Sequence, residues 1–162
     1  MSLQYIIDGC NVTHNFKFIK ILPKKYSDSR AYLIELIKSR NLCGSSNNLI
    51  WVVFDGYPQE GLENLEKIRL KIIFSRRQSA DEKIKKILEL TDNPRNTVVV
   101  SDDKEVSSFA RIMRAKAISV EEFIKVKVPP KDKSRNLDEA KVNYTQMQRI
   151  NKELKEIWLK EK

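Results

Sequence analysis

Short runs of consecutive apolar residues recur along the chain, each bounded by polar or turn-forming residues. Apolar runs of about four to eight residues are typical of strands that are buried on both faces of a parallel sheet. The pattern predicts strands at Tyr5–Asp8, Leu49–Phe54, Leu70–Phe74, Thr97–Ser101 and Ala117–Val120.

Between most of these runs, apolar residues recur at the three- and four-residue spacing of an amphipathic helix. The spacing predicts helices at Tyr32–Arg40, Ala80–Leu90, Lys104–Arg114 and Glu121–Lys125. Ser27 or Asp28 can cap the first of these helices, and Ser79 can cap the second. Because strands and helices alternate, the predicted fold class is α/β with a parallel sheet.

Two connections give weaker signals. The segment from Val12 to Tyr26 mixes aromatic and aliphatic residues with lysines, which predicts a loop or a short helix packed partly on the sheet. Between residues 56 and 69, the spacing of Leu62, Leu65 and Ile68 allows a short helix.

The chain after residue 126 has a different composition. Val128-Pro129-Pro130 and the charged residues that follow are typical of a stiff linker, which we assign to residues 127–135. In residues 136–162 an apolar stripe runs through a segment rich in lysine and glutamate, which predicts a long amphipathic helix. The stripe needs cover from the domain at 1–126, from a second copy in a homodimer, or from another partner.

The composition suits a folded domain. At 162 residues, with 41% hydrophobic and 33% charged residues, the chain is long enough for one domain with a real core. No apolar stretch approaches the roughly 20 residues of a membrane helix, and no signal-peptide pattern opens the chain. We therefore expect a cytoplasmic protein without a membrane partner. Cys10 and Cys43 form no metal-spaced pair, which favours reduced, structural thiols.

The chain is strongly basic, with a formal net charge of +9 and a sequence pI near 9.5. Part of this excess lies at the C-terminal end, where residues 125–162 contain eleven Lys or Arg and six Asp or Glu, a net charge of +5. Such a charge favours a polyanionic partner such as nucleic acid.

Three predicted strands are followed by, or end in, an aspartate: Asp8, Asp55 and Asp102. Parallel strands with crossovers of one hand bring their carboxyl ends to one edge of the sheet, where open α/β folds bind ligands. Asp81, in a first helical turn, is a fourth candidate for this edge. Each has a plainer explanation, because Asp before Gly is common turn chemistry and an acid in a first turn complements the helix dipole. Asp103 is expected to cap the next helix.

If these carboxylates converge, they need a counter-charge, because two of them about 4 Å apart repel by roughly 4 kcal/mol at an effective dielectric constant near 20. Carboxylate oxygens without a set of His or Cys ligands favour Mg²⁺ or Mn²⁺ over Zn²⁺. In a basic protein, a cation held in this way indicates phosphodiester hydrolysis. Asn11 would then orient a water or a phosphate oxygen. Arg76 and Arg77 would bind phosphate at the rim, or form only a solvated loop.

Four motifs occur in order along the chain: Asp8-Gly9-Cys10-Asn11, Val52-Val53-Phe54-Asp55, Phe74-Ser75 with Ser79-Ala80-Asp81, and Val100-Ser101-Asp102. Over about Leu3–Lys125, their order and placement resemble the NYN domain, in the YacP-like branch of the PIN-like nuclease superfamily. This resemblance implies a three-layer PIN-like fold, with a parallel sheet between helices, and metal-dependent endoribonuclease activity on RNA.

Carried over by position, the resemblance implies a catalytic pocket made of Asp8, Asp55, Asp81 and Asp102. Asp8, Asp81 and Asp102 would hold the divalent metal, Asp55 would complete the acidic pocket, and Asn11 would support that pocket. His14 stands where family members often have a histidine and would line the substrate groove, although a lone histidine is usually structural.

The chain departs from the family pattern at two positions. Cys10 stands where the first motif usually has tyrosine, which would remove a ring from the pocket wall. Asp103 stands where the fourth motif often continues with arginine, which makes the site more acidic. The segment after Pro130 lies outside the four motifs, so they imply no role for it.

Two other functions fit parts of the sequence. A non-catalytic module on the same fold, binding RNA or the ribosome, would use the basic C-terminal segment for affinity and would not depend on metal. A receiver-like phosphorelay domain would explain Asp55 at a strand end, but its acidic pair should follow the first strand, whereas Asp102 and Asp103 follow a late one. The preferred hypothesis is an endoribonuclease directed at single-stranded RNA.

Overall fold

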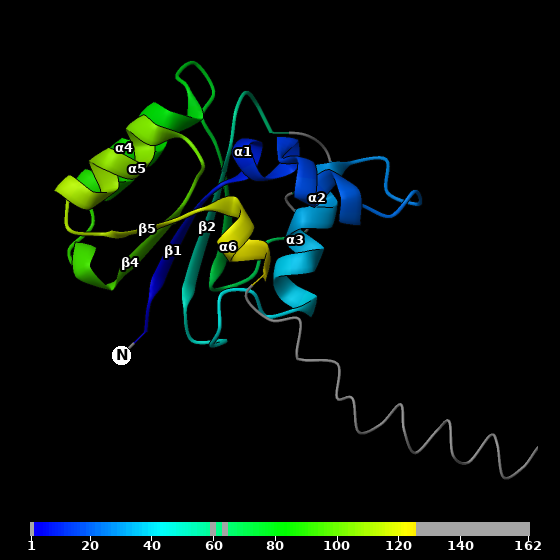
Figure 1. Cartoon of the computed structure of the whole chain (residues 1–162), viewed down its shortest axis with the longest axis horizontal. Coiled ribbons are helices and arrows are strands. Elements are labelled where there is room, and N and C mark those ends of the chain that lie inside the picture. The colour runs from blue at the N-terminus through cyan, green and yellow to red at the C-terminus, as the bar shows by residue number, and fades with distance from the viewer. Residues whose placement is uncertain (1, 59–60, 63–64, 126–162) are drawn as a thin grey trace, which may run out of the picture. The chain divides into compact units, whose positions relative to one another are not determined.

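The computed structural model describes residues 2–58, 61–62 and 65–125 (Figure 1). The linker predicted at 127–135 and the helix predicted at 136–162 lie outside the described residues. Within the described ranges, no helix is long and apolar enough to cross a membrane.

A five-stranded parallel sheet forms the centre of the described domain, in the order β3-β2-β1-β4-β5. Its strands are β1 Gln4–Asp8, β2 Leu49–Phe54, β3 Leu70–Phe74, β4 Thr97–Val100 and β5 Lys116–Ile118. β1 is the middle strand, and its Ile7 lies opposite Val52 of β2 and Val100 of β4. Because every pair is parallel, the carboxyl ends of the strands meet at one edge, as the sequence predicts.

Helices cover both faces of this sheet (Figure 1). They are α1 Gly9–His14, α2 Phe16–Ile21, α3 Ser29–Ser39, α4 Ala80–Glu89, the 3₁₀ helix η2 Pro94–Asn96, α5 Lys104–Ile112 and α6 Val120–Lys125. α1, α2, α3 and α6 lie on one face, and α4 and α5 lie on the other (Figure 1). The domain is therefore a three-layer α/β fold with a parallel sheet between helices.

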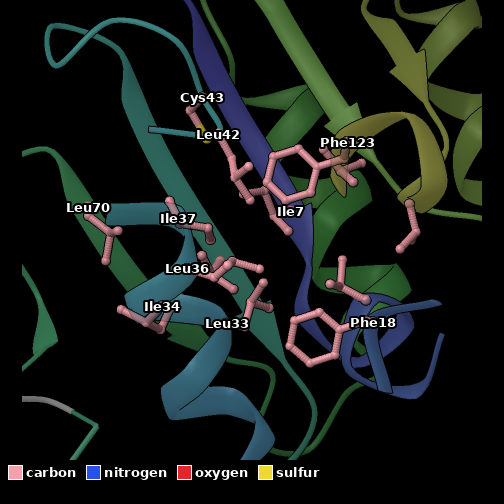
Figure 2. Packing of buried hydrophobic residues seen from close by; sticks show 14 of the residues in the cluster. Ile7, Phe18, Leu33, Ile34, Leu36, Ile37, Leu42, Cys43, Leu70 and Phe123 are labelled. Atoms are coloured by element: carbon pink, nitrogen blue, oxygen red, sulfur yellow. The ribbon is translucent and has the colours of Figure 1, made fainter. Parts of the chain in front are cut away.

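The larger core lies between the sheet and the helices of the layer that contains α3 (Figure 2). Ile7, at the centre of the sheet, is fully buried, as are Leu33 and Ile34 of α3. Phe18 of α2 and Phe123 of α6 close this core, each no more than 1% exposed. The ambiguous segment from Val12 to Tyr26 thus contains the end of α1 and the whole of α2, and α2 supplies a core aromatic ring.

The second core lies under α4 and α5. Ile84 and Leu88 of α4 pack with Val106 of α5 against Ile6 and Val99 of the sheet, and all five side chains are fully buried. The three-and-four spacing read from the sequence therefore selects the residues that face the sheet. This packing fixes the position of α4, whose first turn carries Asp81.

Several elements begin or end one to three residues from the predicted positions, and two differences from the sequence prediction change the role of a residue. Val120 begins α6 instead of ending the last strand, because Ser119 Oγ accepts a 3.1 Å hydrogen bond from Glu122 N and so caps the helix. In the segment before β3, Ile68 is 96% exposed and lies in a turn closed between Lys67 and Leu70, not on the buried side of a helix. Ile68 is therefore not a core residue, whereas Leu62 is buried. Residues 59–60 and 63–64 of this segment lie outside the described residues.

Candidate active site

An open pocket of about 380 Å³ lies where the carboxyl ends of β1, β2 and β4 meet the start of α4. We call it the acidic pocket, and its lining residues are Asp8, Cys10, Asn11, His14, Asn15, Asp55, Ala80, Asp81 and Asp102. All four predicted acids therefore share one pocket with the predicted Asn11 and His14. Its lining, as far as the structure describes it, contains no lysine or arginine.

Asp8 is the most buried of the four acids, with 2% of its surface exposed. It ends β1 and caps α1, where its Oδ1 accepts a 3.0 Å hydrogen bond from Asn11 N. Its Oδ2 accepts a 3.0 Å hydrogen bond from Ser101 Oγ, which links the ends of β1 and β4. Burial raises the pKa of Asp8, and the charges of Asp81 and Asp55 raise it further, although both hydrogen bonds act in the opposite direction.

Asp55 follows β2 and is exposed. Its Oδ1 accepts a 2.6 Å hydrogen bond from Ala80 N, the first residue of α4, and a longer one of 3.4 Å from Ser75 Oγ. A carboxylate at this place also complements the positive end of the helix dipole. Asp55 therefore joins the end of β2 to the start of the helix that carries Asp81.

Asp81 is half-buried in the first turn of α4. Its position is fixed by a capping box, in which Ser79 and Glu82 each bond the other's main-chain nitrogen. Burial raises the pKa of Asp81, and the charges of Asp103 and Asp55 raise it further. Burial and nearby carboxylates thus make both Asp8 and Asp81 harder to ionise.

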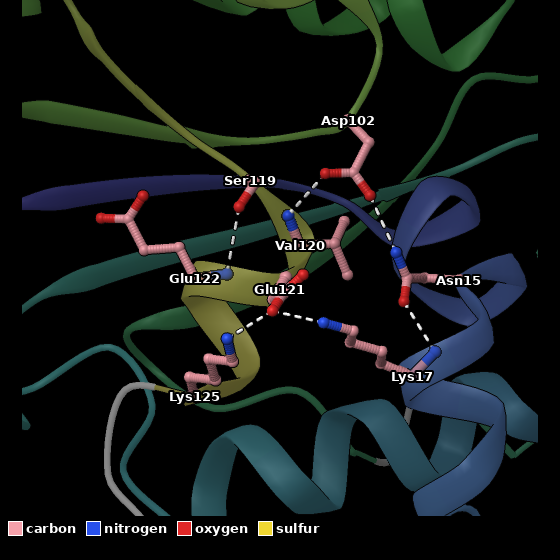
Figure 3. A network of polar contacts seen from close by, with 8 residues as sticks. All are labelled: Asn15, Lys17, Asp102, Ser119, Val120, Glu121, Glu122 and Lys125. Atoms are coloured by element: carbon pink, nitrogen blue, oxygen red, sulfur yellow. Dashed lines mark hydrogen bonds and ion pairs between the residues drawn. The ribbon is translucent and has the colours of Figure 1, made fainter.

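Asp102, after β4, is held by both of its carboxylate oxygens (Figure 3). Oδ1 accepts a 2.9 Å hydrogen bond from Val120 N at the start of α6, and Oδ2 accepts one of 2.8 Å from Asn15 Nδ2. Asn11 adds a third contact, because its Oδ1 accepts a 3.0 Å hydrogen bond from the main-chain nitrogen of Asp102. Asn11 therefore contacts the main chain after β4, and its side-chain NH₂ group, a donor, bonds to no residue of the described ranges.

Asn15 is a pocket residue that the sequence analysis missed. It lies between α1 and α2, and its own Oδ1 caps α2 by accepting a 2.9 Å hydrogen bond from Lys17 N (Figure 3). Nearby, Glu121 of α6 pairs with Lys17 and Lys125, which lower the pKa of Glu121 to about 2. An Asn before a short helix is an N-cap signal in the sequence, but nothing local indicates its contact with Asp102.

His14 lines the acidic pocket as the last residue of α1 and is exposed. Its Nδ1 lies 2.8 Å from the carbonyl oxygen of Cys10. Since a carbonyl only accepts, Nδ1 donates this bond, and Nε2 of the neutral ring is then an acceptor.

Cys10 replaces an expected tyrosine and closes the pocket wall with a small thiol. Its Sγ accepts a 3.2 Å hydrogen bond from Asp55 N. Burial raises the pKa of the Cys10 thiol, which keeps it protonated at neutral pH. Asp103, the other departure, caps α5 through Oδ1, which accepts from Glu105 N and Val106 N. The prediction that Asp103 caps a helix is confirmed.

Gly9 permits a close approach between α1 and β2. A Cβ atom at Gly9 would lie 2.3 Å from the fully buried ring of Phe54. The residue between Asp8 and Cys10 must therefore lack a side chain for α1 to start directly at the edge of the sheet. Gly9 is thus the first residue of α1, and the ring of Phe54 is the reason that it is a glycine.

Arg76 and Arg77 lie outside the acidic pocket. Both are exposed in the loop after β3 and line a second pocket of about 860 Å³, which we call the Tyr57 pocket after another of its lining residues. Their predicted contact with phosphate at the rim of the acid cluster stays a prediction, and the structure assigns them to a different depression.

The acidic pocket fits a hard divalent cation by donor type, because its four acids offer only carboxylate oxygens. The raised pKa values of Asp8 and Asp81 reflect, in part, a repulsion that a cation would relieve. No three His, Cys, Asp or Glu side chains of the described ranges lie close enough together to hold one ion. Mg²⁺ usually keeps several waters and binds through one or two carboxylates, so the donors suit a partly hydrated ion.

Comparison with known proteins tests the family resemblance. The model of the family described as the YacP-like NYN domain matches residues 5–161. The chain belongs to the YacP-like NYN domain family. Members of this family are typically PIN-like nucleases, so the resemblance drawn from four short motifs is confirmed. The match also extends beyond those motifs and includes the segment after residue 126, which the motifs alone do not cover.

Solved structures agree with this assignment at the level of the fold. The YacP-like NYN domain is similar to the crystal structure of Rae1 (YacP) from Bacillus subtilis, with 20% identity, a TM-score of 0.56, and coverage of 96% of this chain and 93% of that chain. A tryptophan-to-leucine mutant of Rae1 gives 22% identity and a TM-score of 0.57, with coverage of 77% and 74%. No curated protein matches the chain.

Proposed function

We propose that this YacP-like NYN domain is a divalent-metal-dependent endoribonuclease that hydrolyses phosphodiester bonds in single-stranded RNA. One observation carries the proposal: four aspartates from separate segments of the chain line one open pocket, whose described lining contains no basic residue. The chain belongs to a family whose members are typically nucleases, which supports phosphodiester hydrolysis as the reaction. The net charge of +9 supports a polyanionic substrate.

In this proposal Asp8, Asp81 and Asp102 hold a partly hydrated Mg²⁺ or Mn²⁺, one or two of them directly and the rest through its water molecules. When bound, the ion supplies a more acidic water and neutralises charge on the phosphate. Asp55 keeps α4 in place through Ala80 N and adds to the negative potential. These roles follow from donor chemistry and from the shared pocket.

Asn11 and His14 have complementary roles toward the substrate. The free NH₂ group of Asn11 is suited to a phosphate oxygen or a water molecule, because its Oδ1 is occupied by Asp102 N. Nε2 of His14, an acceptor, is suited to a hydroxyl donor such as the ribose 2′-OH, which distinguishes RNA from DNA. Both side chains are fixed by main-chain contacts, so both are positioned before the substrate binds.

The test is cleavage of an end-labelled, unstructured RNA in the presence of Mn²⁺ or of EDTA. Asp8→Asn and Asp102→Asn should each cut on the order of 100-fold more slowly than the parent, since several kcal/mol of charge stabilisation is lost. Asp92→Asn is the matched control, because Asp92 is exposed in the turn before η2 and does not line the acidic pocket. If both site variants cut as fast as the parent, the site is assigned wrongly.

A non-catalytic module that binds RNA or the ribosome is the second candidate. A specific observation favours it: both oxygens of Asp8 and of Asp102 already accept hydrogen bonds within the protein. Such carboxylates can serve purely as structural links between strand ends. RNA binding that is unaffected by metal, without any cleavage, would favour this candidate. Homodimerisation through residues 136–162 stays a prediction.

A further inference from the structure

The Tyr57 pocket differs in chemistry from the acidic pocket. Its wall includes two aromatic residues, Tyr57 and Phe74, and three basic residues, Arg76, Arg77 and Lys83. Its described lining contains no Asp or Glu, whereas that of the acidic pocket contains four aspartates. The domain therefore presents two depressions of opposite charge.

The aromatic component of the Tyr57 pocket is accessible. Tyr57 is 61% exposed and lies directly after Gly56 in the loop that follows β2. An exposed aromatic ring contributes no burial of apolar surface to the stability of the fold. An exposed ring beside several cations is a combination that binds unpaired nucleotides, because bases stack on the ring while cations contact the phosphates. Arg76 and Arg77, both exposed, and Lys83 of α4 supply those cations.

The two pockets share a hydrogen-bonded wall. Ser75, which lines the Tyr57 pocket, donates from Oγ to Oδ1 of Asp55, which lines the acidic pocket. The same Ser75 Oγ accepts a 3.2 Å hydrogen bond from Gly56 N. A polymer bound across this wall would contact both pockets.

The loops that carry Tyr57 and Arg76 are joined to each other through their backbones. Arg76 N donates a 2.8 Å hydrogen bond to the carbonyl oxygen of Gly56, and Ser75 N donates one of 2.9 Å to that of Phe54. Arg76 has a φ of 61°, in the left-handed region that is unfavourable for a residue with a side chain. The main-chain bond holds the backbone of Arg76 in this conformation, so the two loops that carry the ring and the arginines lie side by side.

We propose that the Tyr57 pocket binds one unpaired nucleotide of the RNA, next to the phosphate that lies in the acidic pocket. The base stacks on Tyr57, and Arg77 and Lys83 contact the adjoining phosphates. This inference rests on the proposed RNA substrate and adds a subsite to it. An acidic peptide would satisfy the cations, but it would have no need of the exposed ring.

The test measures binding of fluorescein-labelled decauridylate by fluorescence anisotropy in EDTA, where no metal-dependent cleavage occurs. Tyr57→Ala should raise Kd roughly 5- to 150-fold, the loss expected for one stacked base, and Tyr57→Trp should restore binding. Arg77→Ala should reduce the slope of log Kd against log salt by about 0.7, the value for one phosphate contact on a single strand. Arg95→Ala is the matched control, because Arg95 is exposed in η2 and does not line the Tyr57 pocket.

Competitors separate base recognition from charge. Inorganic polyphosphate has no bases, so Tyr57→Ala should leave its affinity unchanged, whereas Arg77→Ala should weaken it. The proposal is overturned if the parent does not bind decauridylate or if Tyr57→Ala binds it as tightly as the parent does. It is overturned as well if Tyr57→Ala weakens the binding of polyphosphate as much as the binding of decauridylate. It is also overturned if decaglutamate competes as well as decauridylate, which would indicate an acidic protein partner. The binding assay contains no metal, so its result does not depend on cleavage. If RNA is not cleaved in the separate assay with Mn²⁺, the proposed reaction is refuted, but the binding result still holds.

Discussion

The side chain of Asn15 donates a 2.8 Å hydrogen bond to Oδ2 of Asp102, across 87 positions of sequence (Figure 3). The bond joins the segment between α1 and α2 to the end of β4. It orients one of the carboxylates that we propose as metal ligands, whereas Asn15 itself has no proposed contact with the ion. Asn15 is therefore a positioning residue, and its removal should act through Asp102.

Asn15→Ala should raise the Mn²⁺ concentration needed for half-maximal thermal stabilisation by roughly tenfold, because loss of a group that orients a metal ligand typically costs 10- to 100-fold in affinity. The measurement is the melting temperature as a function of Mn²⁺ concentration. Asn93→Ala is the control, since Asn93 makes no side-chain cap bond at the start of η2. A lower melting temperature with an unchanged Mn²⁺ midpoint would mean that Asn15 only caps α2.

Gly9→Ala should destabilise the domain by about 1–3 kcal/mol, the usual cost of overpacking a core. The reason is the 2.3 Å approach of the added Cβ to the ring of Phe54. Urea unfolding of Gly9→Ala, Phe54→Leu and the double variant measures the coupling between the two sites. The double variant should lose less than the sum of the single losses, because leucine vacates the space that the ring fills. Strictly additive losses would contradict this steric explanation.

The pH dependence of stability should reveal the crowded carboxylates. Burial and neighbouring charges raise the pKa values of Asp8 and Asp81 above the ordinary 3.8, so the folded state binds protons more tightly than the unfolded chain. In metal-free buffer their contribution to the free energy of unfolding should therefore rise as pH falls from neutral toward that ordinary value. Glu121, with its lowered pKa, contributes in the opposite sense only at lower pH, between 4.5 and about 2.

Asp8→Asn isolates the contribution of Asp8. In EDTA at pH 7 this variant should be more stable than the parent, because it removes a buried charge, and its advantage should shrink as the pH falls toward 3.8. Ser101→Ala should move the rise in stability to higher pH, since the hydrogen bond from Ser101 lowers the pKa of Asp8. Urea unfolding at each pH measures both effects. An Asp8→Asn advantage that stays constant as the pH falls from 7 toward 3.8 would contradict a raised pKa of Asp8.

The sheet could be predicted closely because its signals are local. β2 and β3 begin and end at the predicted residues, since each is an apolar run bounded by polar or turn-forming residues. The acids at strand ends were also predictable, because parallel topology alone brings their ends together. Ile68 shows the limit of this reasoning, since apolar spacing cannot distinguish a buried side chain from one that is 96% exposed.

The parts that could not be predicted depend on contacts between distant segments. Nothing near Asn15 in the sequence indicates Asp102, and nothing near Arg76 indicates that its loop bonds to Gly56 and lines a different pocket from the acids. Gly9 could be identified as a turn residue, but the ring that excludes a side chain there belongs to β2. Such details follow from packing between elements, which no local pattern encodes.

The most direct test of the account is thermal melting with and without Mn²⁺ for the parent, Asp8→Asn and Asp92→Asn, because it needs no knowledge of the RNA. An ion at about 100 times its Kd stabilises a fold by roughly 2.7 kcal/mol. Mn²⁺ should raise the melting temperatures of the parent and of Asp92→Asn, whereas Asp8→Asn should melt at a higher temperature than the parent without metal and should respond little to Mn²⁺. If the parent does not respond, or if Asp8→Asn responds as the parent does, the carboxylates do not form one metal site.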